Sequence, residues 1–303
     1  MNDLELHEFY ENLVRTLRSK GVLCAITSGL ACVHYGIAES TKDCDLLCHT
    51  SSFGTLLDLL AETKVEGAAC RYRGNISPPL DARWHQGGWT SHFEWPGGAG
   101  ALLDVFGSSL REALPWEDDT HGLYAGLQVV AYMKRTDREK DWPFINSIGE
   151  QMLLRKDVRG WLHLYDADLL IELAATNDLP DELLGRRPLL QLVRERSDEL
   201  RYALSAERAY WQELDHLRIR ILRAALRPYV LAVGKAARGT EAELLDQHRL
   251  RVQQAEAHLD PHPLASYGID RFVETARANT LKGISSTLVK WLPDLSEHFR
   301  RFA

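Results

Sequence analysis

Acidic residues on two apolar segments are the most distinctive chemical feature of the sequence. Asp43 and Asp45 fall on the alternating segment 43–48, which is typical of a β-strand. Side chains two positions apart on a strand project from the same face, with Cα atoms about 7 Å apart, so both carboxylates can approach one cation. Asp104 lies in the apolar segment 102–106, where an unpaired carboxylate is costly to bury. Carboxylate oxygens suit Mg²⁺, so the three aspartates predict a divalent-metal site.

Other assignments of these aspartates stay open at the level of sequence. Asp43 and Asp45 fit a solvent-facing strand pair, and Asp104 fits a strand-end cap or a structural ion pair. A turn at Ser28-Gly29 follows the apolar run 22–27 and leads into a short helix. Free backbone N–H groups at such a turn and helix N-terminus favour phosphate.

The elements that must position these residues follow from hydrophobic periodicity. We expect helices over residues 3–20 and 51–63, and a short helix that ends at Gly36. The strands are expected at 22–27, 43–48, 71–73, 89–95 and 101–106. From about residue 125 only helical patterns follow, with breaks near 177–180, at Arg227-Pro228 and at 260–263. The fold class is therefore α+β, a small mixed sheet with flanking helices followed by an all-helical domain. The domains are expected at 1–145 and 146–303.

Four sequence elements, taken together, resemble the nucleotidyltransferase superfamily that includes DNA polymerase beta and the aminoglycoside and minimal bacterial nucleotidyltransferases. Members often carry Gly-Gly-x-Ala after a strand, and Ser28-Gly29-Leu30-Ala31 corresponds to it. Their Arg-x-Thr-x-Asp-x-Asp corresponds to Thr41, Asp43 and Asp45, and their third Asp to Asp104. Segment 134–141 is similar to the Lys-x-x-x-Arg-x-Lys-Asp segment of bacterial members. The resemblance covers about residues 20–145.

The resemblance implies transfer of a nucleoside monophosphate from a nucleoside triphosphate to an acceptor hydroxyl, with release of pyrophosphate. It implies two Mg²⁺ ions, held by Asp43, Asp45 and Asp104, which neutralise charge at the attacking and leaving oxygens. Asp104 would also help to deprotonate the acceptor. Ser28, Gly29 and Thr41 would bind the nucleotide, and Lys134 and Arg138 would lie near the triphosphate. For Lys134 and Arg138 an exposed helix face is the alternative.

Two residues depart from the family pattern. Ser28 replaces the leading Gly, although a hydroxyl can bind phosphate. Glu39 stands where the family has Arg, which reverses a charge beside the expected triphosphate. Glu39 is the one observation that favours a catalytically silent module that binds nucleotide or a partner. A purely structural helical partner protein is a further alternative.

The charge distribution bears on the acceptor. The chain of 303 residues has a net charge of −7, and residues 1–150 hold 13 basic against 21 acidic residues. An acidic first half would attract a cationic aminoglycoside. Residues 186–238 hold 12 basic and 6 acidic residues, which suits RNA phosphates or a solvated helix face. We slightly favour RNA, such as tRNA, or a toxin-type target; a protein acceptor and an antitoxin partner are compatible with the same pattern.

The remaining composition indicates a cytoplasmic globular protein. No apolar stretch approaches the ~20 residues of a membrane span, so no membrane partner is expected. The N-terminus shows no signal-peptide pattern. Five cysteines without a Cys-x-x-Cys pair suit core thiols in a reducing compartment better than zinc ligands. His85 and His92 flank an aromatic segment that could line an acceptor pocket or pack in the core.

Overall fold

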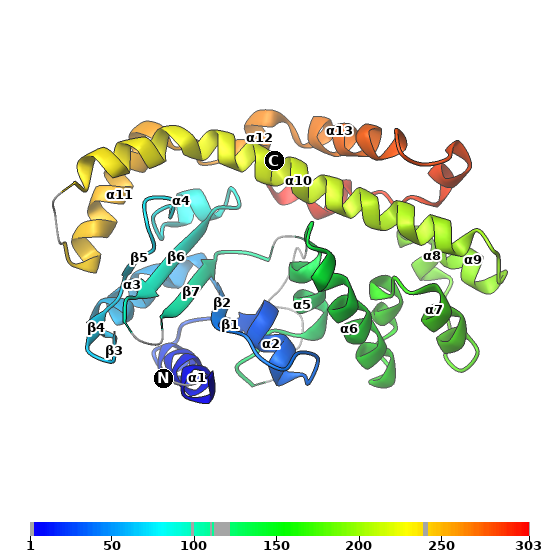
Figure 1. Ribbon diagram of the computed structural model, residues 1–303, viewed down its shortest axis with the longest axis horizontal. Coiled ribbons are helices and arrows are strands. Elements are labelled where there is room, and N and C mark those ends of the chain that lie inside the picture. Colours follow the sequence, from blue (N-terminus) through cyan, green and yellow to red (C-terminus); the bar gives the residue numbers. More distant parts are fainter. Residues whose placement is uncertain (1–2, 98–99, 110, 112–121, 239–241, 303) are drawn as a thin grey trace.

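The computed structural model describes residues 3–97, 100–109, 111, 122–238 and 242–302. It is a mixed α and β protein with a small mixed sheet in the first half and a long helical region after it (Figure 1). The predicted α+β class is confirmed at this level, and the strand segments expected from the sequence all belong to the sheet.

Five strands form the sheet in the spatial order β1-β2-β7-β6-β5. Their bounds are β1 Cys24–Thr27, β2 Asp43–Cys48, β5 Arg71–Tyr72, β6 Thr90–Trp95 and β7 Ala101–Phe106. The β2–β7 pair is parallel, whereas the β1–β2, β6–β7 and β5–β6 pairs are antiparallel. A two-residue hairpin of β3 Lys64–Val65 and β4 Ala68–Ala69 lies outside this sheet and was not expected from the sequence.

Alternation along the central strands gives the sheet one apolar and one polar face. In β6 the side chains of Ser91, Phe93 and Trp95 are buried, whereas those between them are partly exposed. β7 follows the same alternation, with Leu103 and Val105 buried. The buried face belongs to the first hydrophobic core, which includes α1 Asp3–Ser19 and α3 Phe53–Glu62. The polar face is therefore the place to look for chemistry.

Short helices border the sheet and connect it to the helical region. α2 Ser28–His34 packs on β2 and against α5 Leu127–Lys134, which in turn packs on α6 Trp142–Leu154. The first core therefore extends to Ile148 and Met152 of α6. The remaining elements follow in chain order: α4 Ala82–His85, α7 Ala167–Ala174, α8 Glu182–Arg186, α9 Leu190–Arg194, α10 Leu200–Ala236, α11 Leu244–His258, α12 Pro263–Tyr267, α13 Ile269–Leu281, and the 3-10 turns Thr50–Ser52, Glu139–Asp141, Val158–His163, Ser286–Trp291, Ser296–His298 and Arg300–Phe302.

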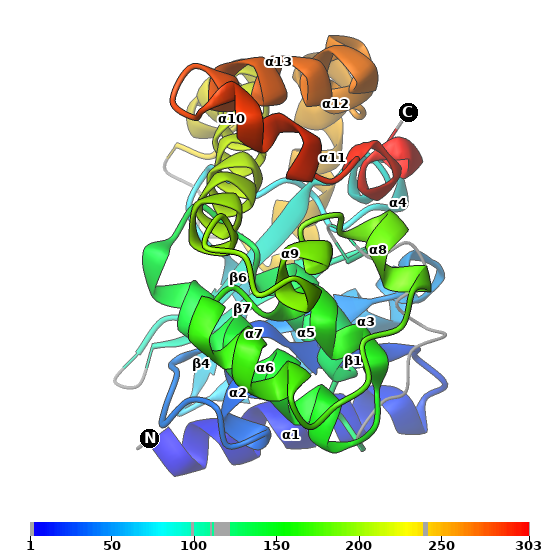
Figure 2. The ribbon, with the colours of Figure 1, turned by 90° about the vertical axis from the view of Figure 1, so that its right-hand side faces the viewer.

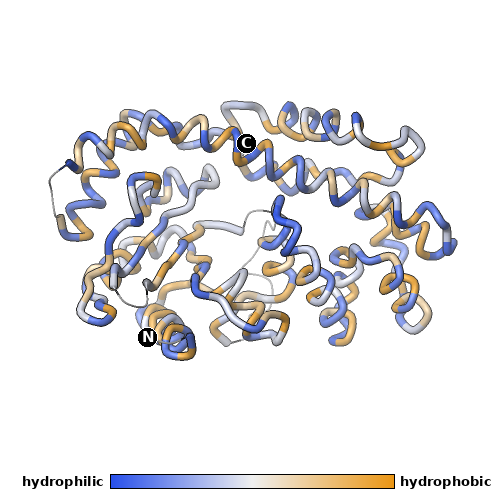
Figure 3. Tube along the Cα trace, viewed as in Figure 1, coloured by the Kyte–Doolittle hydropathy of each residue, from blue (hydrophilic) through white to orange (hydrophobic). Residues whose placement is uncertain are grey.

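The helix α10 corrects one prediction. The break expected at Arg227-Pro228 is wrong, because α10 continues without interruption from Leu200 to Ala236 with Pro228 inside it. Pro228 is exposed, so the carbonyl that loses its hydrogen-bond donor can bind water instead. Figure 3 shows polar and apolar residues interspersed along α10 and α13. None of the helices in the described part of the chain is both long and apolar enough to cross a membrane.

α10 extends across both parts of the molecule, as Figures 1 and 2 show from two directions. Its first half belongs to the large helical core, and its second half joins a third small core with α11 and the α4 region. The Tyr229 hydroxyl donates a hydrogen bond to the Ser77 carbonyl at 2.8 Å. The Trp84 and Trp89 indoles donate to backbone carbonyls of Leu259 and Asp260. The C-terminal helices thus hold the sheet from its β5 side.

Gly87 tests this attachment. A Cβ at Gly87 would lie 1.7 Å from the Pro261 carbonyl oxygen, whereas a Cβ at the exposed helical Gly54 would meet nothing within 4 Å. We expect Gly87→Ala to lower the free energy of unfolding by about 1–3 kcal/mol through overpacking. The control Gly54→Ala should raise it by about 0.5–1 kcal/mol, because alanine favours helix. Urea denaturation measures both; a harmless Gly87→Ala would contradict the attachment.

Candidate functional site

A row of polar residues crosses the sheet from one edge to the other on its polar face. Thr27 of β1 is opposite Asp45 of β2, and Asp45 is opposite Asp104 of β7. Asp104 is opposite His92 of β6, whose carbonyl accepts a hydrogen bond from the Arg73 backbone beside β5. Residues directly opposite one another project from the same face, so these five side chains lie next to one another across the adjacent strands. The strand pairing alone thus brings Asp45 and Asp104 together.

Asp45 is the most perturbed carboxylate of the row. Burial, together with the facing Asp104 carboxylate, raises the pKa of Asp45 to about 6, although the Ser28 hydroxyl and the Lys134 ammonium act to lower it. The neighbouring Thr27 hydroxyl is fully buried and has no hydrogen-bond partner among the described residues. The surroundings of Asp45 therefore disfavour its negative charge, and a proton or a cation would relieve this cost.

Asp104 has two polar neighbours that the sequence analysis did not assign to it. Its Oδ1 lies 2.7 Å from Arg73 Nη2 and 2.8 Å from His92 Nδ1. Arg73 Nη2 also lies 3.1 Å from His92 Nδ1. Asp104 therefore forms an ion pair with Arg73, which is one of the assignments that the sequence left open. Nothing in the local sequence marks Arg73, because its contact with Asp104 depends on the pairing of β5, β6 and β7.

Asp43 lies on the same face as Asp45 but at the open end of β2. It is exposed and pairs with Leu102 rather than with a polar residue. The Tyr10 hydroxyl lies beside this end of β2, where it donates to the Leu102 carbonyl at 2.8 Å and accepts from the Leu102 N–H at 2.9 Å. Asp43 contributes charge to the site, since its carboxylate also raises the pKa of Asp45.

The turn after β1 leads directly into α2. Ser28 adopts φ +55°, a left-handed conformation that Gly adopts more readily than Ser. Gly29 is needed for space, because a Cβ there would lie 2.9 Å from Thr41 Oγ1. Thr41 therefore contacts the turn, and Ser28 hydrogen-bonds Asp45. Glu39 is exposed on the loop before Thr41.

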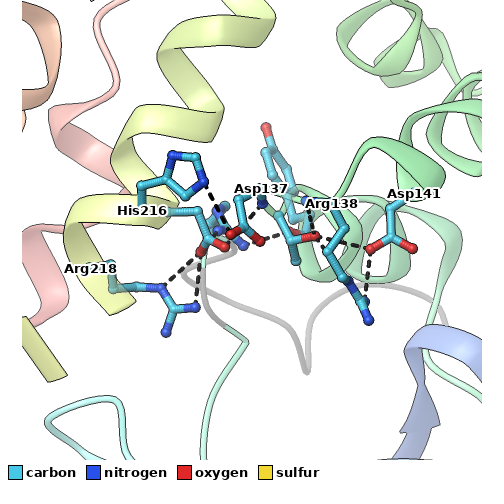
Figure 4. Close-up of polar contacts among 9 residues, drawn as sticks. Asp137, Arg138, Asp141, His216 and Arg218 are labelled. Atoms are coloured by element: carbon cyan, nitrogen blue, oxygen red, sulfur yellow. Dashed lines mark hydrogen bonds and ion pairs between the residues drawn. The ribbon is translucent and has the colours of Figure 1, made fainter. Parts of the chain in front are cut away.

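Lys134 and Arg138 are separated by the structure. Lys134 is 6% exposed; its Nζ lies 3.3 Å from Asp141 Oδ1, and its charge acts on Asp45. Arg138 is half exposed and binds the other oxygen of Asp141 at 2.8 Å. Figure 4 shows Arg138 and Asp141 on the turn after α5, facing His216 and Arg218 of α10. Lys134 thus joins the site, whereas Arg138 is part of the outer ion-pair network.

This network ties the turn 135–141 to α10. The Asp137 carboxylate lies 3.2 Å from His216 Nε2, and the Asp137 backbone N–H donates to Asp215 (Figure 4). Asp215 is buried and pairs with Arg218 at 2.9 Å and with the buried Arg111 at 2.6 Å. These two guanidinium groups hold the pKa of Asp215 low despite its burial. The position of Lys134 is therefore fixed from the α10 side.

The carboxylates fit a divalent cation in part. Asp45 and Asp104 share a face and repel each other, which is the electrostatic situation that Mg²⁺ relieves. Within the residues that the structure describes, no three His, Cys, Asp or Glu side chains form a group that could hold a metal ion. Arg73 engages one oxygen of Asp104, so the second oxygen and the Asp45 carboxylate are the ligands on offer.

The remaining candidates belong to the core. All five cysteines are buried and free, and burial raises the pKa of each thiol. His85 is 1% exposed, its Nε2 lies 2.8 Å from Ser91 Oγ, and burial lowers its pKa to about 3. His85 therefore packs in the core as a neutral side chain, whereas His92 belongs to the polar row.

Comparison with known proteins leaves the site to be interpreted from its own residues. No protein-family profile, no curated protein and no solved structure matches the chain. The similarity to the nucleotidyltransferases therefore depends on the motif residues named above and on how they are arranged.

Asp45→Asn tests the strained carboxylate. The folded-state pKa of about 6 lies above the ordinary 3.8, so ionised Asp45 destabilises the fold. This cost is absent at low pH and grows as the pH rises through about 6. We expect the variant to exceed the wild type in free energy of unfolding by at most about 3 kcal/mol at neutral to alkaline pH, less for a partly exposed group.

The measurement is urea denaturation of both proteins across the acidic and neutral range. The difference should disappear towards about pH 4, where both side chains are neutral. The exposed Asp58→Asn serves as the control and should show no such pH dependence. A difference that grows on acidification would contradict the raised pKa.

Proposed function

We propose that the chain is a Mg²⁺-dependent nucleotidyltransferase that moves a nucleoside monophosphate from a nucleoside triphosphate to an acceptor hydroxyl. The observation that carries this proposal is the pair Asp45 and Asp104, opposite each other on neighbouring strands, with the pKa of Asp45 raised to about 6. A buried charge of this kind is common at functional sites because it is strained until a ligand or cation arrives.

Each nearby residue has a role that follows from its place. Asp45 and the free oxygen of Asp104 would hold Mg²⁺, and Asp43 would add negative charge at the open end of β2. The metal supplies charge neutralisation at the transferred phosphoryl group. Lys134 lies beside Asp45 and is positioned to neutralise triphosphate oxygens. Gly29 allows the turn to pack closely on the Thr41 side chain, and backbone N–H groups of this turn would bind a phosphate.

Arg73 and His92 refine the expected role of Asp104. Asp104 is already bound by the Arg73 guanidinium. His92, which lies against both Asp104 and Arg73, is the second group within reach of an acceptor proton. We propose that Asp104 and His92 share the deprotonation of the acceptor hydroxyl, with Arg73 as the residue that orients them.

The test is transfer of label from each α-labelled nucleoside triphosphate, with Mg²⁺, to tRNA, cell protein or aminoglycosides. We expect Asp45→Asn and Asp104→Asn each to lower transfer by roughly a hundredfold or more, the scale of losing charge stabilisation in the transition state. The exposed Asp58→Asn should leave transfer unchanged. Circular dichroism checks that all three variants fold.

The acceptor that received the label decides between the alternatives. Label on aminoglycosides would favour the antibiotic-modifying enzyme, and label on protein would favour a protein target. Failure of transfer to every acceptor, together with tight Mg²⁺-triphosphate binding that Asp45→Asn does not weaken, would favour the silent binding module. An antitoxin partner would appear as a protein that suppresses transfer.

One feature of α10 favours RNA as the acceptor. Arg220, Arg223 and Arg227 are exposed and lie on one face of the helix at i, i+3 and i+7. Residues 216–238 contain no Asp or Glu, and none of these three arginines forms an ion pair with another described residue. In contrast, Arg187, Arg194, Arg201, Arg208 and Arg218 are paired with carboxylates. The basic surface without carboxylate partners therefore includes fewer residues than the whole segment 186–238.

Replacement of Arg220, Arg223 and Arg227 by Gln tests this surface. We expect weaker tRNA binding and a salt dependence of log Kd against log salt that is shallower by roughly 2–3, one unit per lost phosphate contact. The control replaces the exposed Lys20, Lys64 and Lys282 by Gln, which removes the same charge elsewhere. Fluorescence anisotropy at several salt concentrations measures both. Equal losses in the two variants would indicate attraction by net charge alone.

A further inference from the structure

A cavity lies in the helical region, away from the carboxylate row, that is, the row of polar residues that contains Asp45 and Asp104. It has a volume of about 280 Å³, and residues from α5, α8, α10 and the C-terminal turns line it. Its charged lining residues are Arg135, Arg186, Arg187, Glu207, Asp294 and Glu297, and its aromatic walls include Tyr132, Trp211 and His298. The proposed function gives this cavity no role.

Arg135 is a buried guanidinium without a carboxylate partner. It is 2% exposed, and it forms no ion pair within the described part of the chain. Its Nη2 donates to the Leu162 carbonyl at 2.5 Å and to His163 Nδ1 at 2.8 Å, and its Nε has no partner there. The rings of Tyr132 and Trp211 lie 4.5 and 4.7 Å from its Cζ. Buried charges are ordinarily paired, so a missing anion is implied.

Two further donors in the same wall lack acceptors. Arg187 uses Nε for Glu207 and Nη1 for the Trp161 carbonyl, which leaves Nη2 without a partner among the described residues. The Trp211 indole N–H is likewise buried and without a partner there. The cavity thus has a surplus of hydrogen-bond donors, and the chemical complement of such a surplus is a group rich in acceptor oxygens.

The acidic residues of the cavity do not supply that complement. Glu207 is paired with Arg187 at 2.9 Å, and Glu297 is paired with Arg300 at 2.7 Å. Asp294 accepts a hydrogen bond from the Ser296 backbone, which holds its pKa low. Burial and the surrounding arginines lower the pKa of His298 to about 4, so His298 adds no positive charge near neutral pH. Arg135 and the exposed Arg186 therefore form no ion pair with a described carboxylate, and Asp294 is the one acidic residue of the lining that is outside an ion pair within the described part of the chain.

We infer that this cavity is a binding site for a small phosphate-bearing molecule, with the phosphate between Arg135, Arg186 and Arg187. Guanidinium groups bind phosphate through paired, charge-assisted hydrogen bonds. The cavity has room for more than the phosphate alone, and its lining includes the aromatic side chains of Tyr132 and Trp211. The site is separate from the carboxylate row and does not depend on the proposed transfer reaction.

Thermal unfolding of the full chain with inorganic phosphate tests the site. We expect about 50 mM phosphate to raise Tm by roughly 2–4 °C over sodium chloride of equal ionic strength, as for a ligand of millimolar Kd. Arg135→Met, which keeps the length of the side chain, should abolish the increase. Arg186→Ala at the exposed rim should fold normally and weaken phosphate binding roughly twofold to fivefold.

Two comparisons make the result decisive. Asp45→Asn should leave the phosphate effect unchanged, whereas phosphate bound beside Asp45 would respond to loss of that charge. A nucleoside monophosphate that binds more tightly than inorganic phosphate, through Arg135, would identify an aromatic ligand; equal affinity would limit the ligand to the phosphate group. The inference would be overturned if phosphate did not raise the Tm of the wild type. It would also be overturned if phosphate raised the Tm of Arg135→Met and Arg186→Ala as much as that of the wild type.

Discussion

The repulsion between Asp45 and Asp104 is the constraint on which the site depends. Strand order alone puts them side by side, because β2 and β7 run parallel in a register that matches these two residues. Four surrounding residues reduce the cost of that arrangement: Ser28 and Lys134 act on Asp45, and Arg73 and His92 bind Asp104. The two facing carboxylates raise the free energy of the folded state, and the well-packed apolar face of the sheet offsets this cost.

The helical region contributes to this site from the outside. α10 carries Asp215, which binds the turn that ends in Asp141, and Asp141 in turn binds Lys134. The same turn begins with Arg135, whose side chain lines the cavity in the helical region. Two adjacent residues at the end of α5 thus belong to two different polar environments, one built around excess negative charge and one around excess positive charge.

Much of the sheet could be predicted from the sequence, and so could the aspartates. Alternation of apolar and polar residues is local information, so segments 43–48 and 101–106 were recognisable as strands, and Asp104 stood out because a charge is unusual there. Arg73 could not be predicted, because its contact with Asp104 arises from pairing across β5, β6 and β7. Pro228 was misinterpreted because local preference disfavours proline in a helix, whereas packing of Tyr229 and Val233 keeps α10 continuous. Arg135 looked like any basic residue, since burial is not a property of its neighbours in sequence.

The continuity of α10 also fixes a length. Its 37 residues extend roughly 55 Å at the rise of an α-helix. Between Leu217 and Tyr229 none of its side chains is fully buried. Ile221 packs against the large helical core, and Leu222, Ala225 and Leu226 pack against the third core. The helix therefore links the two parts of the molecule along its whole length. It bends most easily where Pro228 leaves one backbone hydrogen bond unmade.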